Sequence, residues 1–150
     1  MRALIQRVKH ASVSINGSLH CQIGRGLLIL LGVAADDNHE ATVYLANRCS
    51  NLRIFEDNAG KMNCSVKDIG GSALVVSQFT LYADTRKGNR PSFTEAAAPE
   101  IAEKFYDEFV ATLKSELGDS HVGSGIFRSM MDISLINDGP VTMMLESKNQ

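Results

Sequence analysis

The feature that most constrains the fold is the unbroken apolar run "GLLILLGVA", residues 26–34. A run of this length makes one strand, whereas a helix that crosses a bilayer needs about 20 apolar residues. Because no position in it is charged, we predict a fully buried strand. No other apolar run is as long, so no contact with a membrane is expected.

Other strand-like segments are rich in apolar or β-branched residues and are bounded by turn residues. The first is followed by "NGS", which predicts a tight hairpin. Near the end of the chain, "MMDISLI" and "VTMMLES" flank "NDGPVT", so two strands joined by a turn are expected there. The predicted strands are residues 3–15, 19–24, 26–34, 53–57, 72–82, 130–136 and 141–147.

Two segments predict helices. Residues 36–52 begin with acidic residues and carry apolar residues near helical spacing. The second helix has clearer boundaries, since Pro99 suits a first helical turn and Gly118 can end the helix. Between them, apolar residues spaced four apart predict the buried stripe. The stripe consists of Ile101, Phe105, Phe109, Leu113 and Leu117.

The order of these elements is strands, helix, strands, helix, strands, without regular β-α-β alternation. This order favours an α+β fold in which a largely antiparallel, barrel-like sheet curls around a core and two helices cover it. A length of 150 residues fits a single domain over residues 1–150. Only the last residues, 146–150, are expected to be frayed.

The net charge and the cysteines limit which partners and which cell compartment are expected. A formal net charge of -2 argues against a protein that coats nucleic acid with a broad basic face, although a contact with one nucleic-acid end stays possible. The cysteines are odd in number and form no CxxC motif, which predicts a reduced, cytoplasmic compartment. They are Cys21, Cys49 and Cys64.

The chain lacks the common catalytic motifs: GxSxG, a Walker loop, GxGxxG, HExxH and paired zinc cysteines are all missing. No metal and no cofactor is therefore expected. The histidines are scattered over separate predicted elements, and none has a visible orienting partner. They are His10, His20, His39 and His121.

Three polar segments remain as candidate sites. "SQFT", residues 77–80, ends a buried strand and either satisfies backbone groups at a sheet edge or points into a pocket. "NDGPVT", residues 137–142, resembles a turn, yet its proline removes a backbone donor where a strand should begin pairing. The loop with Arg86, Lys87 and Arg90 is either solvated or contacts phosphate.

Taken together, these segments resemble the D-aminoacyl-tRNA deacylase family. The resemblance rests on "QRV", "GLLILLGV", "RIFED..GKMN", "GGSALVVSQFTL", "ADTRKGNRPSF" and "SLINDGPVT", in order along nearly the whole chain. Enzymes of this family are homodimers that hydrolyse the ester between a D-amino acid, or glycine, and the 3′-terminal adenosine of tRNA. The resemblance therefore implies the aminoacylated tRNA 3′ end and a second copy of the chain as partners, and no DNA.

The resemblance also implies residue roles. Gly139 and Pro140 should form a cis element that enters the partner's active site, and Arg7 should steady it. The adenine should lie between Phe127 and Met131. In "FRSMM", Arg128 and Ser129 replace the small residues that commonly follow this phenylalanine, which leaves adenosine recognition open. The catalytic pocket should be lined by Ser77, Gln78, Phe79 and Thr80.

An aminoacyl ester is already activated and carries a neighbouring 2′-OH on the ribose. We therefore expect backbone N–H groups near Phe79 and Thr80 to form an oxyanion hole while the 2′-OH assists water. Two further functions stay open: an esterase for small amino-acid esters, and a dimeric module that binds the tRNA end without catalysis. Thr80 as a covalent nucleophile is the competing mechanism, although no base adjoins it in the sequence.

Overall fold

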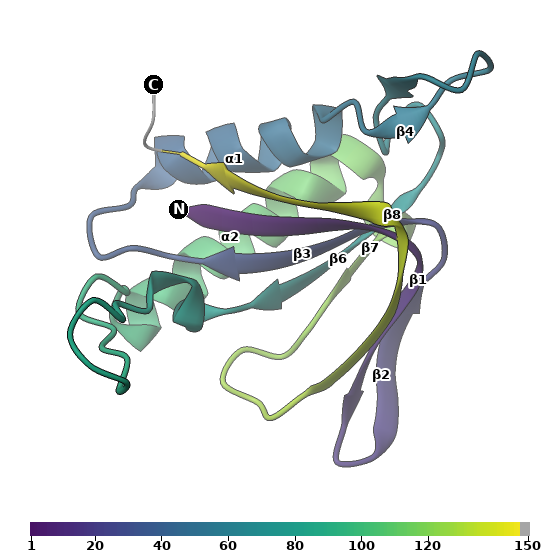
Figure 1. Ribbon diagram of the computed structural model, residues 1–150. Helices are drawn as coiled ribbons and strands as arrows, with labels where there is room; N and C mark the ends of the chain where they lie inside the picture. The colour runs from purple at the N-terminus through teal and green to yellow at the C-terminus, as the bar shows by residue number, and fades with distance from the viewer. Residues whose placement is uncertain (148–150) are drawn as a thin grey trace.

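The computed structural model describes residues 1–147, and residues 148–150 of the end predicted to be frayed lie outside this range. Figure 1 shows two helices beside a strongly curled sheet. The elements in chain order are β1 (Arg2–Ile15), β2 (Ser18–Ile23), β3 (Gly26–Gly32), α1 (His39–Asn51), β4 (Phe55–Glu56), β5 (Met62–Cys64), β6 (Ser72–Ser77), the 3₁₀-helix η1 (Phe79–Tyr82), α2 (Pro99–Leu117), the 3₁₀-helix η2 (Asp119–His121), β7 (Val122–Ser124) and β8 (Asp132–Glu146).

The sheet is mixed and curls almost into a barrel, and β1 is the strand with the most neighbours. This strand pairs antiparallel with β2, β3 and β8, while β3 pairs parallel with β6 and β6 pairs parallel with β7. The predicted α+β fold, with a barrel-like sheet and two helices, is confirmed. The hairpin at "NGS" is confirmed as well, because Asn16 and Gly17 have the positive φ values, 52° and 77°, of a tight turn.

The apolar run at residues 26–34 forms β3, which is buried on both faces as predicted. Leu27 and Ile29 pack in the cluster that faces the helices, and Leu28 packs in a second cluster on the opposite face. Neighbouring β6 divides in the same way, with Val75 on the helical side and Val76 on the other. Side chains therefore cover both faces of these two parallel strands, which accounts for their unbroken apolar sequence.

Both helices lie on the same face of the sheet (Figure 1). Asn38 caps α1, because its side chain accepts a hydrogen bond from the Ala41 N–H at 2.9 Å, so the helix starts later than residue 36. Helix α2 has the predicted bounds, from Pro99 to the residue before Gly118. Its predicted stripe is correct in the middle, but Ile101 at one end is 45% exposed. Within residues 1–147, neither helix is long and apolar enough to cross a membrane.

The three strands predicted after residue 70 differ from the structure. The strand expected over residues 72–82 ends at Ser77, because the chain then enters η1, where the Leu81 N–H donates to the Gln78 carbonyl at 3.2 Å. The two strands expected around "NDGPVT" are one strand, β8, which pairs with β1 on both sides of the motif. The hairpin prediction is wrong because the chain bulges out between Asn137 and Thr142 and continues in the same direction.

The described part of the predicted frayed end is also ordered. Glu146 belongs to β8, and the Ser147 N–H donates to the Met1 carbonyl at 3.1 Å. Met1 and Ser147 therefore lie side by side.

Candidate active site

A pocket of about 630 Å³ opens where β6 ends, between η1, the start of α2 and the segment that follows β7. This volume suits a small organic ligand. The lining is mostly apolar and aromatic, with a few polar groups from the ends of the elements. The lining residues are Leu31, Val33, Val76, Ser77, Gln78, Phe79, Phe93, Ala96, Ala97, Pro99, Ala102, Tyr106, Phe127, Arg128, Ser129, Met130, Met131 and Ile133.

The "SQFT" segment reaches this pocket through its first three residues. Thr80 is exposed and does not line the pocket, and its hydroxyl accepts a hydrogen bond from the Gln78 amide at 2.5 Å. In a 3₁₀-helix each N–H donates to the carbonyl three residues earlier, so the first N–H groups have no partner within the helix. In η1 these are the N–H groups of Phe79 and Thr80, and the Leu81 N–H is the first to bond, to the Gln78 carbonyl. Of Phe79 and Thr80, Phe79 lines the pocket.

The aromatic wall of the pocket includes a residue that sequence reasoning missed. Phe79 is 58% exposed and packs edge-on against Phe93, with ring centroids 4.9 Å apart. Phe93 ends the polar loop of residues 83–93, and an aromatic residue in that position is the signal that would have found it. The exposed edge of this pair is available to a ligand.

Phe127 and Met131 lie in the same pocket as the "SQFT" residues, although about 50 residues separate them in the sequence. Tyr106 supports this wall: its ring centroid is 5.9 Å from that of Phe127. Its hydroxyl shares one proton between the carbonyls of Val75, at 3.0 Å, and Gly125, at 2.9 Å. Burial raises the pKa of Tyr106, so the hydroxyl stays protonated and keeps donating. Sequence reasoning had missed Tyr106.

The unusual residues after Phe127 also belong to the pocket. Arg128 and Ser129 both line it, and Arg128 has a backbone φ of 63°, in the left-handed region. A charged side chain therefore lies at the edge of an otherwise apolar wall.

Gly139 and Pro140 are joined by a cis peptide bond, as the resemblance implies. Both residues are exposed, and neither lines the pocket of its own chain. Asn137 braces the bulge, since its Oδ1 accepts from the Val141 N–H at 3.0 Å and its Nδ2 donates to the Val141 carbonyl at 3.1 Å. The bulge is therefore a rigid, outward-facing segment.

Arg7 holds this bulge from beneath. Its Nε donates to the Asp138 carbonyl at 2.8 Å, its Nη1 donates to the Ile54 carbonyl at 2.5 Å, and the residue is only 6% exposed. Gln6, to which no role had been assigned, adds a second support by accepting from the Asn137 amide at 3.0 Å. A buried arginine with two backbone acceptors fixes the chain immediately before Gly139.

The three basic residues of the loop are in different situations. Arg86 forms a two-fold hydrogen-bonded ion pair with Asp84, at 2.9 Å and 2.8 Å, and this contact lowers the pKa of Asp84 to about 2. Lys87 and Arg90 are exposed. A phosphate could therefore contact Lys87 and Arg90 directly, whereas a contact with Arg86 would compete with Asp84.

Among the described residues, no His, Cys, Asp or Glu side chain lines this pocket. Burial raises the pKa of Cys49 to about 12, so its thiol is protonated and unreactive. The residues that the structure describes contain no group of three or more His, Cys, Asp or Glu side chains placed to hold a metal ion.

Residues 4–146 match the family described as D-Tyr-tRNA(Tyr) deacylase. The chain is 54% identical to a D-aminoacyl-tRNA deacylase of Chlorobaculum tepidum, over 98% of this chain and 97% of that protein. It is 56% identical to a D-aminoacyl-tRNA deacylase of Chloroherpeton thalassium, over 98% of this chain and 96% of that protein.

Two solved structures share the fold. One is that of a c-Myc DNA Unwinding Element Binding Protein, with a TM-score of 0.93 and 40% identity over 97% of this chain and 98% of that one. The other is that of a probable eukaryotic D-amino acid tRNA deacylase, with a TM-score of 0.85 and 19% identity over the same shares. Its likeness shows the fold.

The fold and the family match show that the protein is a tRNA deacylase, which is a hydrolase. Within that class, the chain belongs to the D-Tyr-tRNA(Tyr) deacylase family.

Proposed function

We propose that this protein hydrolyses the ester bond of D-aminoacyl-tRNA and of glycyl-tRNA, and so removes wrongly attached amino acids in the cytoplasm. The observation that carries the proposal is the mostly apolar pocket at the end of β6, which Phe79 lines where η1 begins. The terminal adenosine occupies the aromatic part of this pocket, near Phe127 and Met131. The ester carbonyl then lies against the backbone of η1.

The proposed chemistry needs no side-chain nucleophile. Water adds to the ester carbonyl carbon, and negative charge develops on the carbonyl oxygen, where the two N–H groups of η1 stabilise it. Each such donor contributes about 3 kcal/mol to stabilisation of the transition state. The added water gives up a proton, the bond to the ribose 3′-oxygen breaks, and that oxygen takes up a proton in turn. Within residues 1–147, the Thr80 hydroxyl is bonded to Gln78 and to no histidine or lysine, which argues against Thr80 as nucleophile.

The 2′-OH of the terminal ribose orients the attacking water in this mechanism. A substrate with a 2′-deoxy terminal adenosine should therefore bind the enzyme but hydrolyse far more slowly. Single-turnover rates of the two substrates provide the measurement. Equal rates would rule out participation of the 2′-OH.

In this proposal the protein is a homodimer, and Gly139 and Pro140 of the second copy select D- over L-aminoacyl groups. Their exposure, and their absence from the pocket of their own chain, support a contact between subunits. Backbone carbonyls of this element accept the α-ammonium group and leave no room for a side chain in the L position. Exclusion by steric clash predicts tolerance of varied D side chains and of glycine.

The decisive experiment compares deacylation of matched D- and L-aminoacyl-tRNA, such as D-Tyr-tRNA and L-Tyr-tRNA. We expect rapid hydrolysis of the D form alone, and equal rates would refute the proposal. Rapid hydrolysis of a simple D-tyrosine methyl ester would favour a small-molecule esterase. Firm binding of tRNA without hydrolysis would favour a binding module. Competition by duplex DNA tests whether the tRNA end is the preferred nucleic-acid partner.

A further inference from the structure

The far side of η1, away from the pocket, rests on a row of residues that crosses three strands. Arg2 of β1 pairs with Glu146 of β8 on one side and with Gly32 of β3 on the other. The row ends beneath η1, the turn that carries Phe79 and Thr80. The start of β1, the end of β8 and η1 therefore meet at one place.

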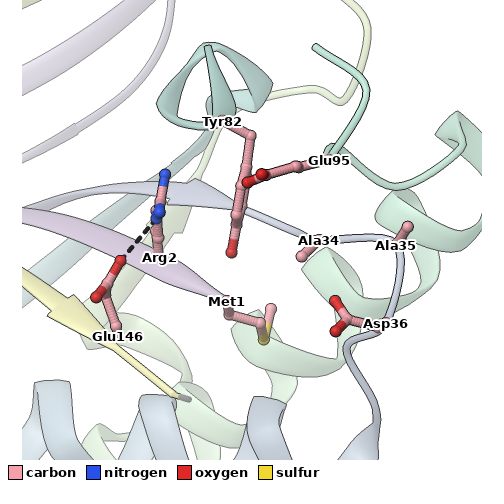
Figure 2. Close-up of a pocket in the computed structure, with 8 residues that line it drawn as sticks. All are labelled: Met1, Arg2, Ala34, Ala35, Asp36, Tyr82, Glu95 and Glu146. Atoms are coloured by element: carbon pink, nitrogen blue, oxygen red, sulfur yellow. Dashed lines mark hydrogen bonds and ion pairs between the residues drawn. The ribbon is translucent and has the colours of Figure 1, made fainter. Parts of the chain in front are cut away.

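Arg2 contacts both the row and the turn. Its Nε donates to Glu146 Oε1 at 2.7 Å (Figure 2). Its Nη1 donates to the Leu81 carbonyl at 2.9 Å. Its guanidinium carbon lies 4.6 Å from the centroid of the Tyr82 ring. Figure 2 shows Tyr82 extending from η1 with its ring between Arg2 and Glu95. Arg2 thus holds the last two residues of η1 by a hydrogen bond and a cation–π contact.

Gly32 lets η1 lie directly on the end of β3. A Cβ atom at this position would be 3.2 Å from the Gln78 carbonyl oxygen, from Leu81 Cβ and from Tyr82 Cδ2. These contacts are tighter than normal packing, so a larger residue would lift η1 away from the sheet. The turn is consequently held between a close backbone support and the Arg2 side chain.

We propose that Arg2, oriented by Glu146, is a positioning residue that fixes η1 so that the Phe79 and Thr80 amides aim at the ester carbonyl. This inference rests on the proposed function, in which those amides stabilise the oxyanion. Arg2 lies outside the pocket beside Phe79 and lines a separate pocket together with Tyr82 and Glu146. It acts through Leu81 and Tyr82, so its loss should impair the chemical step and leave binding of the adenosine largely intact.

The test substitutes Arg2→Met, which keeps an unbranched apolar stem and removes every side-chain donor. A misplacement of about 1 Å at a catalytic group can cost about 100-fold in rate, so we expect kcat to fall about 10- to 100-fold while KM changes little. Arg2→Lys should recover part of kcat, since one ammonium group cannot serve both Glu146 and Leu81 with the same geometry. Unchanged kcat, or an effect on KM alone, would overturn the proposal.

Lys67→Met is the matched control. Lys67 and Glu116 form an ion pair of the same length, 2.7 Å, with side-chain exposures of 38% and 29% against 34% and 33% for Arg2 and Glu146, and it lies outside the pocket. This variant should keep the wild-type kcat. If the loss of kcat in Arg2→Met equals the loss of folded protein in a thermal melt, the residue is only structural and the proposal fails.

Hydrogen–deuterium exchange provides a readout that does not depend on activity. The Leu81 and Ala83 amides donate to the Gln78 and Thr80 carbonyls, so a loosened η1 should exchange them faster in Arg2→Met than in Lys67→Met. Equal exchange would overturn the role of Arg2 even if kcat fell. If the wild-type protein hydrolyses no D-aminoacyl-tRNA, the proposed function fails, and the exchange result still decides whether Arg2 holds η1.

Discussion

At Gly139 the backbone comes so close to Val141 that the site accepts no side chain. A Cβ atom there would lie 2.8 Å from Val141 Cγ2 and closer still to the Val141 nitrogen. That nitrogen donates to Asn137 Oδ1 and is part of the bracing of the bulge. The glycine therefore has a local packing reason, independent of any contact that the bulge makes with a partner.

We expect Gly139→Ala to displace the bulge and to lower kcat/KM on D-aminoacyl-tRNA at least about 10-fold, because misplaced contacting groups lose that much readily. Kinetics on D-Tyr-tRNA provide the measurement. Gly24→Ala is the control, since a Cβ at Gly24 meets nothing within 4 Å, and it should behave like the wild type. Full activity of Gly139→Ala would show that the geometry of the bulge is unimportant.

At the scale of elements, Tyr106 joins α2 to the strand ends that carry the pocket wall. Tyr106→Phe removes the hydroxyl that bonds to the carbonyls of Val75 and Gly125. The Val75 carbonyl still accepts from the Gly125 N–H, whereas the Gly125 carbonyl loses the hydroxyl as its partner. We expect a loss of roughly 1–2 kcal/mol in the free energy of unfolding, measured by urea denaturation. KM should rise because the Gly125 carbonyl, two residues before Phe127, loses the hydroxyl that holds it.

Tyr44→Phe on α1, outside the pocket, is the control for this substitution. It should leave KM unchanged. A Tyr106→Phe enzyme with wild-type stability and KM would contradict the role given to the hydroxyl.

The basic loop makes a separate prediction about salt. If Lys87 and Arg90 each contact one phosphate of the tRNA end, Lys87→Gln and Arg90→Gln should each reduce the slope of log Kd against log salt by about 0.7. Arg86→Gln should change the slope less, because Asp84 already holds that guanidinium. Titrations of tRNA at several salt concentrations measure the slopes. Equal slopes for all variants and for Lys67→Gln would exclude the loop from binding.

At the scale of the whole molecule, the proposed exchange of Gly139–Pro140 between subunits predicts complementation. One variant, Gly139→Ala, has an intact pocket, and a second, Phe79→Ala, has an intact Gly-Pro element. Unfolding and refolding the two together should produce heterodimers with one complete site each. Random pairing makes half of the dimers mixed, so about one quarter of wild-type activity should return. A mixture no more active than its components would contradict a shared site.

Local patterns predicted much of this architecture. The apolar run of residues 26–34, the turn at Asn16–Gly17 and the bounds of α2 each depend on neighbouring residues, and each was correct. The segment "SQFT" was correctly placed at the end of a buried strand, although η1 was not foreseen. The prediction that Ile101 is buried was wrong, because an apolar stripe shows which residues share a helical face and not how far the sheet extends beneath that face.

The amino-acid sequence by itself determined the buried strand, the two helices, the glycine and proline of the bulge, and the family resemblance, because short-range periodicity and backbone chemistry are written in consecutive residues. Only the tertiary structure decided that β8 continues past the bulge, since that depends on which strand it pairs with. The same holds for Phe93, Tyr106 and Phe127, which meet in one pocket, and for Arg2 and Glu146, which lie 144 residues apart and still form an ion pair. Contacts at such separations depend on how the sheet curls, and no local pattern encodes them.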